Sequence, residues 1–110
     1  MCGILGCSLK STQILESEFW ESLQMLEHRG PDHIGMQFTA DAKIALGHTR
    51  LSIIDLSPNA HQPMSHLSQN IQIVFNGEIY NFQDLKKQLI NLGHVFKSQG
   101  DTEVILNGYI

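Results

Sequence analysis

The sequence predicts an α+β fold, because short helix-like and strand-like segments follow one another in mixed order. Two segments carry apolar residues at helical spacing, and several short runs are apolar or alternate between apolar and polar residues. Of the 110 residues, 42% are hydrophobic and 16% are charged, which is typical of a globular domain. We therefore expect one small domain with a hydrophobic core of its own.

The first quarter of the chain predicts one strand and one helix. The apolar run 3–9 is typical of a buried strand, and Cys7 within it is expected to pack as a small hydrophobic residue. Residues 16–32 predict a helix that is stopped by Gly30 and Pro31. Its apolar stripe follows helical spacing: Leu15, Phe19, Leu23 and Leu26.

The next segment predicts two strands and a loop. Residues 34–54 are typical of a strand pair around the turn-like sequence ADAK at 40–43. We expect residues 51–54 to continue the second strand, with most of their apolar side chains in the core. Residues 55–70 are polar and contain two prolines, so they predict a loop.

The last third predicts a strand, a helix and two further elements. Residues 71–77 alternate in polarity like a strand. Residues 81–93 predict a helix with Asn81 as the N-cap, Gly93 at its end and an apolar stripe: Phe82, Leu85, Leu89 and Leu92. Residues 94–98 are expected to form a short strand, and a third helix or buried segment is expected from Thr102 onward. Because no stop signal follows, we interpret the chain as a fragment.

Composition argues against several classes of protein. The net charge is −4 without a run of Lys and Arg, so we expect neither a nucleic-acid partner nor a membrane-surface partner. We identify no transmembrane run and no signal peptide. Two cysteines form neither a disulfide framework nor a CxxC pair, which indicates a cytoplasmic location. The histidines lack metal-ligand spacing and predict scattered structural or surface positions rather than a metal site: 28, 33, 48, 61, 66 and 94.

Cys2 follows the start methionine directly and is a candidate nucleophile. Aminopeptidases generally remove a start methionine when the next residue is small, which would leave Cys2 with a free α-amine. An α-amine titrates near 7.7–8.0, so part of it is unprotonated at neutral pH and can accept the thiol proton. Gly3 would leave space for a substrate beside the sulfur. The alternative is a cysteine that stands at this position by accident.

Five further motifs follow the initial "MCGI", which has the cysteine in second place. In order along the chain they are "HRGPD" (28–32), "GHTRLSIIDLS" (47–57), "QPM" (62–64), "NGEIYN" (76–81) and "GDTEVI" (100–105). Together they resemble the class II glutamine amidotransferase domain of glutamine-hydrolysing asparagine synthetases over the whole chain. This resemblance implies an α+β fold of the N-terminal-nucleophile hydrolase type, an αββα sandwich. Residues 1–110 would be only the N-terminal part of that domain.

The resemblance also implies catalytic roles. Cys2 would attack the side-chain amide of glutamine and form a γ-glutamyl thioester, and water would then release glutamate. The side chain of Asn76 and the backbone N–H of Gly77 would stabilise the oxyanion. The alternative for these two residues is a hairpin turn. Arg29 and Gly30 match a turn near the nucleophile, so we regard them as supporting residues.

The resemblance further implies a binding site for free glutamine. Arg50 would bind the α-carboxylate, and Glu78 and Asp101 would accept from the α-ammonium. Part of the pocket border would come from the adjoining segment: Leu51, Ser52, Ile53 and Ile54. The alternatives are a surface charge for Arg50 and a helix N-cap for Asp101.

The members of this family carry a second domain, which the chain lacks. It is an ATP-dependent synthetase domain that uses ATP and Mg²⁺ to amidate aspartate; we expect no cofactor in residues 1–110. The implied partners are glutamine, the synthetase domain in the same polypeptide and a second copy in a homodimer. Two alternatives stay open: an amidotransferase with a different acceptor, or a truncated α+β binding module without catalysis.

Overall fold

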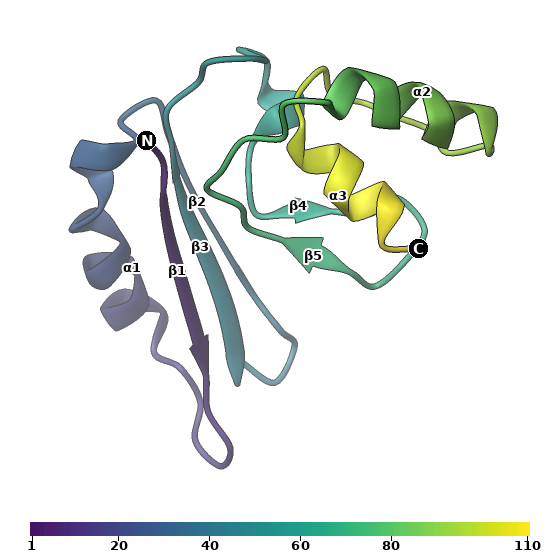
Figure 1. Ribbon diagram of the computed structural model, residues 1–110. Coiled ribbons are helices and arrows are strands. Elements are labelled where there is room, and N and C mark those ends of the chain that lie inside the picture. Colours follow the sequence, from purple (N-terminus) through teal and green to yellow (C-terminus); the bar gives the residue numbers. More distant parts are fainter.

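A three-stranded antiparallel sheet forms the left half of the structure in Figure 1. The computed structural model describes the whole chain. The strands of this sheet are β1 (Gly3–Ser8), β2 (His33–Phe38) and β3 (Ile44–Arg50), and they lie side by side in the order β1-β3-β2. The N-terminal strand and the strand pair are confirmed, and with the helices they form an α+β fold. Because Gly3 lies opposite Thr49, the N-terminus lies beside the end of β3.

Helix α1 (Glu16–Gln24) covers one face of this sheet and closes the hydrophobic core. Phe19 and Leu23 are buried against Ala45 of β3, whereas Leu15, also expected in the apolar stripe, is 58% exposed. The helix lies close to the sheet, because a Cβ added to Gly47 would lie 2.9 Å from Cδ1 of Leu23. Half-buried side chains complete the core: Leu5, Cys7, Ile14, Ile34, Met36 and Phe38.

The helix expected over residues 16–32 was predicted too long. A separate 3-10 turn covers Glu27–Arg29 after the end of α1. The carbonyl oxygen of Leu26 accepts a hydrogen bond from the Thr49 hydroxyl at 3.0 Å, which ties this segment to β3. Gly30 then passes so close to the backbone of Thr49 that no Cβ would fit there. Tertiary contacts with β3 therefore override the helical pattern of the sequence.

Short elements follow β3 and lie to the right of the sheet in Figure 1: β4 (Met64–Ser65), β5 (Gln72–Ile73), α2 (Phe82–Asn91) and α3 (Thr102–Gly108). β4 and β5 pair as a second antiparallel sheet. The polar loop expected over 55–70 thus contains β4 and a 3-10 turn (Pro58–Ala60), and the strand expected over 71–77 is limited to β5.

The helix expected over residues 81–93 is confirmed as α2, with differences at both ends. Asn81 occupies the N-cap position, but its side chain forms no capping hydrogen bond. Leu92, counted in the expected stripe, follows the helix and is 76% exposed. Gly93 adopts a φ of +95°, a left-handed conformation that favours glycine and ends the helix. The third helix is confirmed as α3.

The strand predicted over residues 94–98 does not exist, so this prediction was wrong. The backbone N–H groups of Lys97 and Ser98 donate to the carboxylate of Glu103, at 2.9 and 2.7 Å. The side-chain amide of Asn107 donates to the carbonyl oxygen of Val95 at 3.1 Å. Polar side chains of α3 therefore satisfy the backbone groups that a neighbouring strand would otherwise bind.

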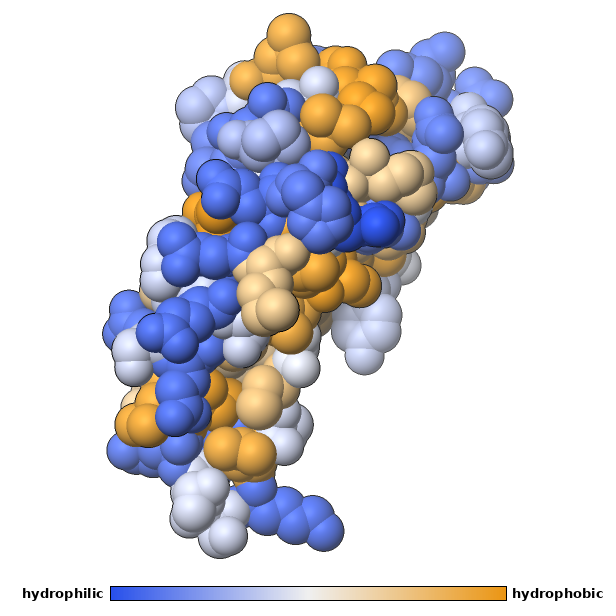
Figure 2. Space-filling model, turned by 90° about the vertical axis from the view of Figure 1, so that its left-hand side faces the viewer, coloured by the Kyte–Doolittle hydropathy of each residue, from blue (hydrophilic) through white to orange (hydrophobic).

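The surface is mainly hydrophilic when it is viewed from the side that carries α1 (Figure 2). Apolar residues gather at one end of this view, uppermost in the picture, and form smaller groups elsewhere. None of the helices combines the length and the apolar character needed to cross a membrane.

Candidate active site

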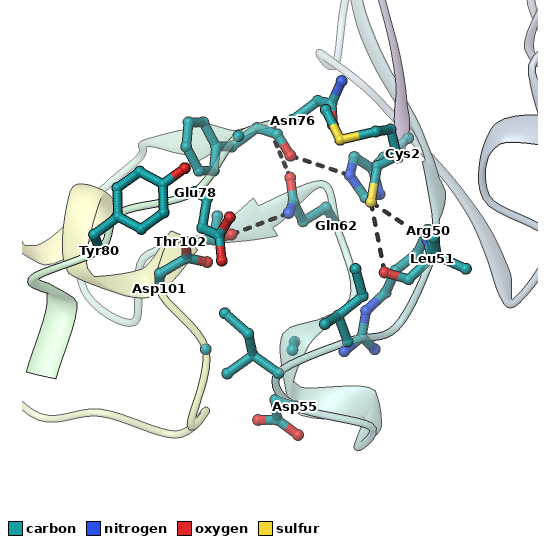
Figure 3. Close-up of a pocket in the computed structure, with 18 residues that line it drawn as sticks. Cys2, Arg50, Leu51, Asp55, Gln62, Asn76, Glu78, Tyr80, Asp101 and Thr102 are labelled. Atoms are coloured by element: carbon teal, nitrogen blue, oxygen red, sulfur yellow. Dashed lines mark hydrogen bonds between the residues drawn. The ribbon is translucent and has the colours of Figure 1, made fainter.

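A cavity of about 380 Å³ lies where the N-terminus, the end of β3 and the loops before α2 and α3 meet (Figure 3). It brings together all residues to which the sequence assigned catalysis or glutamine binding, except Ser52. The lining residues with assigned roles are Cys2, Arg50, Leu51, Ile53, Ile54, Asn76, Gly77, Glu78 and Asp101. Segments far apart in the sequence therefore contribute candidate groups to one site.

Cys2 lies at one wall of the cavity, beside the segment that leaves β3. The backbone N–H of Leu51 donates to the Cys2 sulfur at 3.3 Å, and the thiol lies 3.7 Å from the carbonyl oxygen of Leu51. The antiparallel register of β1 with β3 leads to this contact, because the pair that would follow Gly3–Thr49 is Cys2 with Arg50, the residue before Leu51. The backbone of Leu51 thus holds the sulfur at the wall of the cavity.

Polar contacts from the 3-10 turn and β3 hold the N-terminal segment in place. The backbone N–H of Gly3 donates to the Thr49 hydroxyl at 3.1 Å, and Arg29 Nε donates to the carbonyl oxygen of Cys2 at 3.2 Å. Gly30 is buried where its backbone meets that of Thr49. Neither Arg29 nor Gly30 lines the cavity, so both lie where a supporting residue would lie.

Residues 51–54 do not continue β3, so the expectation that they extend the strand into the core was wrong. β3 ends at Arg50, and Ile53 and Ile54 are 74% and 43% exposed. The chain turns away here because the backbone N–H of Ser52 donates to the carboxylate of Asp32 at 2.7 Å instead of to a neighbouring strand. The two isoleucines line the cavity, whereas Ser52 lies outside its lining.

Arg50 is only 5% exposed, so the interpretation as a surface charge was wrong. Its Nη1 donates to the carbonyl oxygen of Ser57 at 2.9 Å, a backbone group and not a carboxylate. Arg50 also lines the cavity, and a buried guanidinium with further N–H groups is suited to bind an anionic ligand group.

The Asn76–Gly77 segment is held through the backbone of Phe75. The N–H of Phe75 donates to Oε1 of Gln62 at 2.6 Å, and Nε2 of His48 lies 3.3 Å from its carbonyl oxygen. Since a carbonyl accepts only, Nε2 carries the proton. Complete burial of His48 lowers its pKa to about 4, so the ring is neutral at physiological pH. The segment is no hairpin turn, because no strand begins after it.

The acidic residues lie across the cavity from Cys2 and Arg50 (Figure 3). Glu78 is exposed, whereas Asp101 is only 7% exposed. One oxygen of Asp101, Oδ2, accepts a hydrogen bond from the backbone N–H of Ile79 at 2.9 Å, which joins the two acidic segments. Asp101 occupies the N-cap position of α3 without a side-chain capping bond, so the alternative interpretation of its carboxylate as a helix cap is wrong.

Several lining residues received no role from the sequence, among them His48, Asp55 and Gln62. Gln62 also donates from Nε2 to the Thr102 hydroxyl at 3.1 Å and so bridges two walls of the cavity. His48 and Gln62 belong to the recognised motifs "GHTR" and "QPM", and Asp55 belongs to "LSIIDLS". Their position within these motifs was the signal in the sequence that could have identified them as residues of the site.

Three of the six histidines gather near the cavity instead of being scattered. His33 and His61 stack with ring centroids 3.5 Å apart, and burial lowers the pKa of both. His48 is completely buried. The expectation of structural histidines is confirmed for His48, whose Nε2 bonds the backbone of Phe75.

Comparison with known proteins gives one consistent result. A family model described as a glutamine amidotransferase domain matches residues 1–110. The chain is 40% identical over 113 residues to a glutamine-hydrolyzing asparagine synthetase 1 of Bacillus subtilis (strain 168), covering 99% of the chain and 17% of that protein. It is 40% identical over 97 residues to the amidase chry2 of Gibberella zeae, covering 88% and 14%. A putative glutamine-hydrolyzing asparagine synthetase 2 of Methanocaldococcus jannaschii is 38% identical over 126 residues, covering 99% and 24%.

Proposed function

The chain belongs to the glutamine amidotransferase family, and we propose that Cys2 is its nucleophile in the hydrolysis of glutamine. The observation that carries this proposal is the convergence of Cys2, Arg50 and Asp101 on one cavity from separate parts of the chain. We further propose that Met1 is removed, because only then does Cys2 carry the free α-amine that can act as a base.

The proposed reaction needs no group beyond this site and water. The Cys2 sulfur attacks the side-chain amide carbon of glutamine while the α-amine of Cys2 takes the thiol proton. When the tetrahedral intermediate collapses, the C–N bond breaks, the α-amine protonates the leaving nitrogen, and ammonia departs from a γ-glutamyl thioester. Water then attacks the thioester carbon, releases glutamate and restores the thiol.

We assign the oxyanion to the side-chain N–H of Asn76 and the backbone N–H of Gly77. Both residues line the cavity, and His48 and Gln62 hold the preceding Phe75. Removal of one such donor typically costs about 2.7–4 kcal/mol of activation free energy. The proposal therefore makes the position of this segment important for the turnover rate.

We assign the α-carboxylate of glutamine to Arg50 and its α-ammonium to Glu78 and Asp101. Arg50 is buried and bound to a backbone carbonyl, which leaves its other N–H groups for a ligand. Oδ2 of Asp101 is already bonded to the N–H of Ile79, so the other carboxylate oxygen is the proposed acceptor. Leu51, Ile53 and Ile54 would border the carbon chain of the substrate.

We propose that the natural protein is a glutamine-hydrolysing asparagine synthetase. The chain spans 14–24% of the length of the three relatives described above, which supports a synthetase domain in the same polypeptide. We propose that ATP and Mg²⁺ bind that domain. An acceptor other than aspartate is the alternative, because one relative is named an amidase.

We also propose the remaining properties implied by the family. The observed sheet and α1 would form one part of an αββα sandwich of the N-terminal-nucleophile hydrolase type, with residues 1–110 as the N-terminal part of the domain. The face of the sheet opposite α1 exposes Ile4 and Ile44, at 48% and 47%, which supports a second layer. A homodimer and a cytoplasmic location complete the proposal, the latter supported by two free cysteines.

The test uses a thiol-alkylating analogue of glutamine on the protein as its gene encodes it. Cys7 is the matched control, because it lies on β1, the strand that follows Cys2, is also half-buried and packs on the core. We expect a mature terminus that begins at Cys2, labelling at Cys2 and not at Cys7, and protection by free glutamine. Retention of Met1 together with equal labelling of both cysteines would contradict the proposal and favour a binding module without catalysis.

A further inference from the structure

We propose that Asp55 is a positioning residue that fixes the distance between Arg50 and Asp101. This inference rests on the proposed function, in which these two residues bind the two charged groups of glutamine. Asp55 would thereby make the pocket selective for amides that carry both an α-carboxylate and an α-ammonium. It is 8% exposed, lies at one end of the cavity and received no role from the sequence (Figure 3).

The carboxylate of Asp55 joins two loops through its two oxygens. Oδ2 accepts from the backbone N–H of Gln99 at 2.7 Å, and Oδ1 accepts from the backbone N–H of Ser57 at 2.8 Å. The loops also touch at this point, because a Cβ added to Gly100 would lie 3.9 Å from the Cβ of Asp55. The Gln99 and Ser57 donors hold the pKa of Asp55 at about 2, so the carboxylate is ionised at physiological pH.

Each loop connects directly to one of the two recognition groups. On one side, the carbonyl oxygen of Ser57 accepts from Nη1 of Arg50 at 2.9 Å. On the other side, Gln99 stands two residues before Asp101. A continuous path of hydrogen bonds and short backbone segments therefore leads from Arg50 through Asp55 to Asp101.

The Asp101 side of this path is fixed independently of Asp55. The carboxylate of Glu103 accepts from the N–H and the hydroxyl of Ser98, both at 2.7 Å, and so attaches the residue before Gln99 to α3. The hydrogen bond from Gln99 to Asp55 then positions the loop that carries Ser57 against a rigid partner. Loss of the carboxylate would free this loop and, with it, the guanidinium of Arg50.

A ligand with both charges is more sensitive to this spacing than a ligand with one. A rigid two-point site binds best when the distance between its groups matches the ligand. An analogue with only one of the two charged groups binds only Arg50 or only the acidic residues, so it can move together with that group when the distance changes. Glutaric acid monoamide lacks the α-ammonium, and 4-aminobutanamide lacks the α-carboxylate, so these two compounds separate the contributions.

The experiment compares Asp55→Asn with Asp41→Asn in the protein as its gene encodes it. Asparagine keeps one acceptor oxygen but presents an N–H₂ group to the other backbone N–H, so one of the two bonds is lost. Asp41 is the matched control, because its carboxylate also accepts two local bonds, from Thr39 Oγ1 at 2.7 Å and Lys43 N at 3.1 Å, in a turn that does not line the cavity. Steady-state glutaminase kinetics and the inhibition constants of both analogues are measured.

For Asp55→Asn we expect KM for glutamine to rise about tenfold or more while kcat stays within about threefold of the wild type. The inhibition constants of the two analogues should change by less than about threefold. Asp55→Glu, which keeps the charge with one more methylene, should give a KM between those of wild type and Asp55→Asn. This variant provides the same comparison if the asparagine variant does not fold.

Equal changes for glutamine and both analogues would overturn the proposal, because they indicate a general disturbance of the site. The same holds if Asp55→Asn behaves like Asp41→Asn. If the wild-type protein hydrolyses glutamine and one of these two results is obtained, the positioning role of Asp55 is refuted and the proposed function stands. A wild-type protein without glutaminase activity would overturn the proposed function and this inference together.

Discussion

Substitution of Gln62 by Met tests whether the backbone of Phe75 is positioned by a side chain. Gln62 is 6% exposed; its Oε1 accepts from the Phe75 N–H at 2.6 Å, and its Nε2 donates to the Thr102 hydroxyl at 3.1 Å. Methionine has a similar length but forms neither bond. The Phe75 N–H and the Thr102 hydroxyl are then left without a partner, at about 1–3 kcal/mol each, so the local stability should fall by about 2–6 kcal/mol in total.

The effect on catalysis follows from the residue after Phe75. Asn76 is the proposed oxyanion donor, and complete loss of such a donor lowers kcat about 10²–10³-fold. A displaced donor keeps part of its effect, so we expect kcat to fall by about tenfold to a hundredfold in Gln62→Met. KM for glutamine should change less, because Arg50 and Asp101 are not bonded to Phe75.

The assay combines glutaminase kinetics with hydrogen exchange at the Phe75 amide. Gln62→Glu is the matched control, because a carboxyl group can accept from the Phe75 N–H and bond the rotatable hydroxyl of Thr102 in either protonation state. It should retain more of kcat than Gln62→Met. Faster exchange at Phe75 in Gln62→Met with an unchanged kcat would refute the link between this contact and the oxyanion donor.

Two further predictions concern stability. Because burial holds the pKa of His48 at about 4, below its unfolded value of 6.5, the unfolded state binds more protons between these values. Local stability of β3 should therefore fall by up to about 3 kcal/mol as the pH drops from 6.5 to 4, and His48→Gln should remove most of this dependence in hydrogen exchange measured across that range. An equal dependence of local stability on pH in the wild type and in His48→Gln would contradict this prediction. Gly30→Ala should lower the melting temperature strongly, because its Cβ would overlap the backbone of Thr49. Gly6→Ala should change the melting temperature little, because its Cβ would lie 3.9 Å from Leu46 Cδ2, an ordinary contact. Equal shifts of the melting temperature in the two variants would disprove the steric argument.

The N-terminal sheet and its helix could be predicted because their patterns are local. The core residues Phe19 and Leu23 stand one helical turn apart, and the turn at 40–43 separates two apolar runs. The absence of a strand over residues 94–98, by contrast, could not be predicted from a local pattern. Its backbone donors at Lys97 and Ser98 bind Glu103, and nothing in the sequence of a short apolar run shows that a side chain will replace a neighbouring strand.

The candidate site was predictable to the extent that its residues belong to ordered motifs. Cys2, Arg50, Asn76 and Asp101 were identified by resemblance, and the structure places them around one cavity. Asp55 was not identified, because its partner Gln99 is a backbone amide 44 positions away and imposes no side-chain type at that position. Side chains that bind distant backbone groups leave little trace in a single sequence.

Separate contacts position the groups proposed for chemistry and the groups proposed for recognition. Cys2 depends on the pairing of β1 with β3, which is set by the register of the sheet. The Asn76 segment is joined to β3 by His48, and the loop after β3 is joined to the Asp101 side by Asp55. A change at His48 should therefore act mainly on kcat, whereas a change at Asp55 should act mainly on KM, although both side chains line the same cavity. Equal effects of the two changes on kcat and on KM would show that these contacts do not act separately.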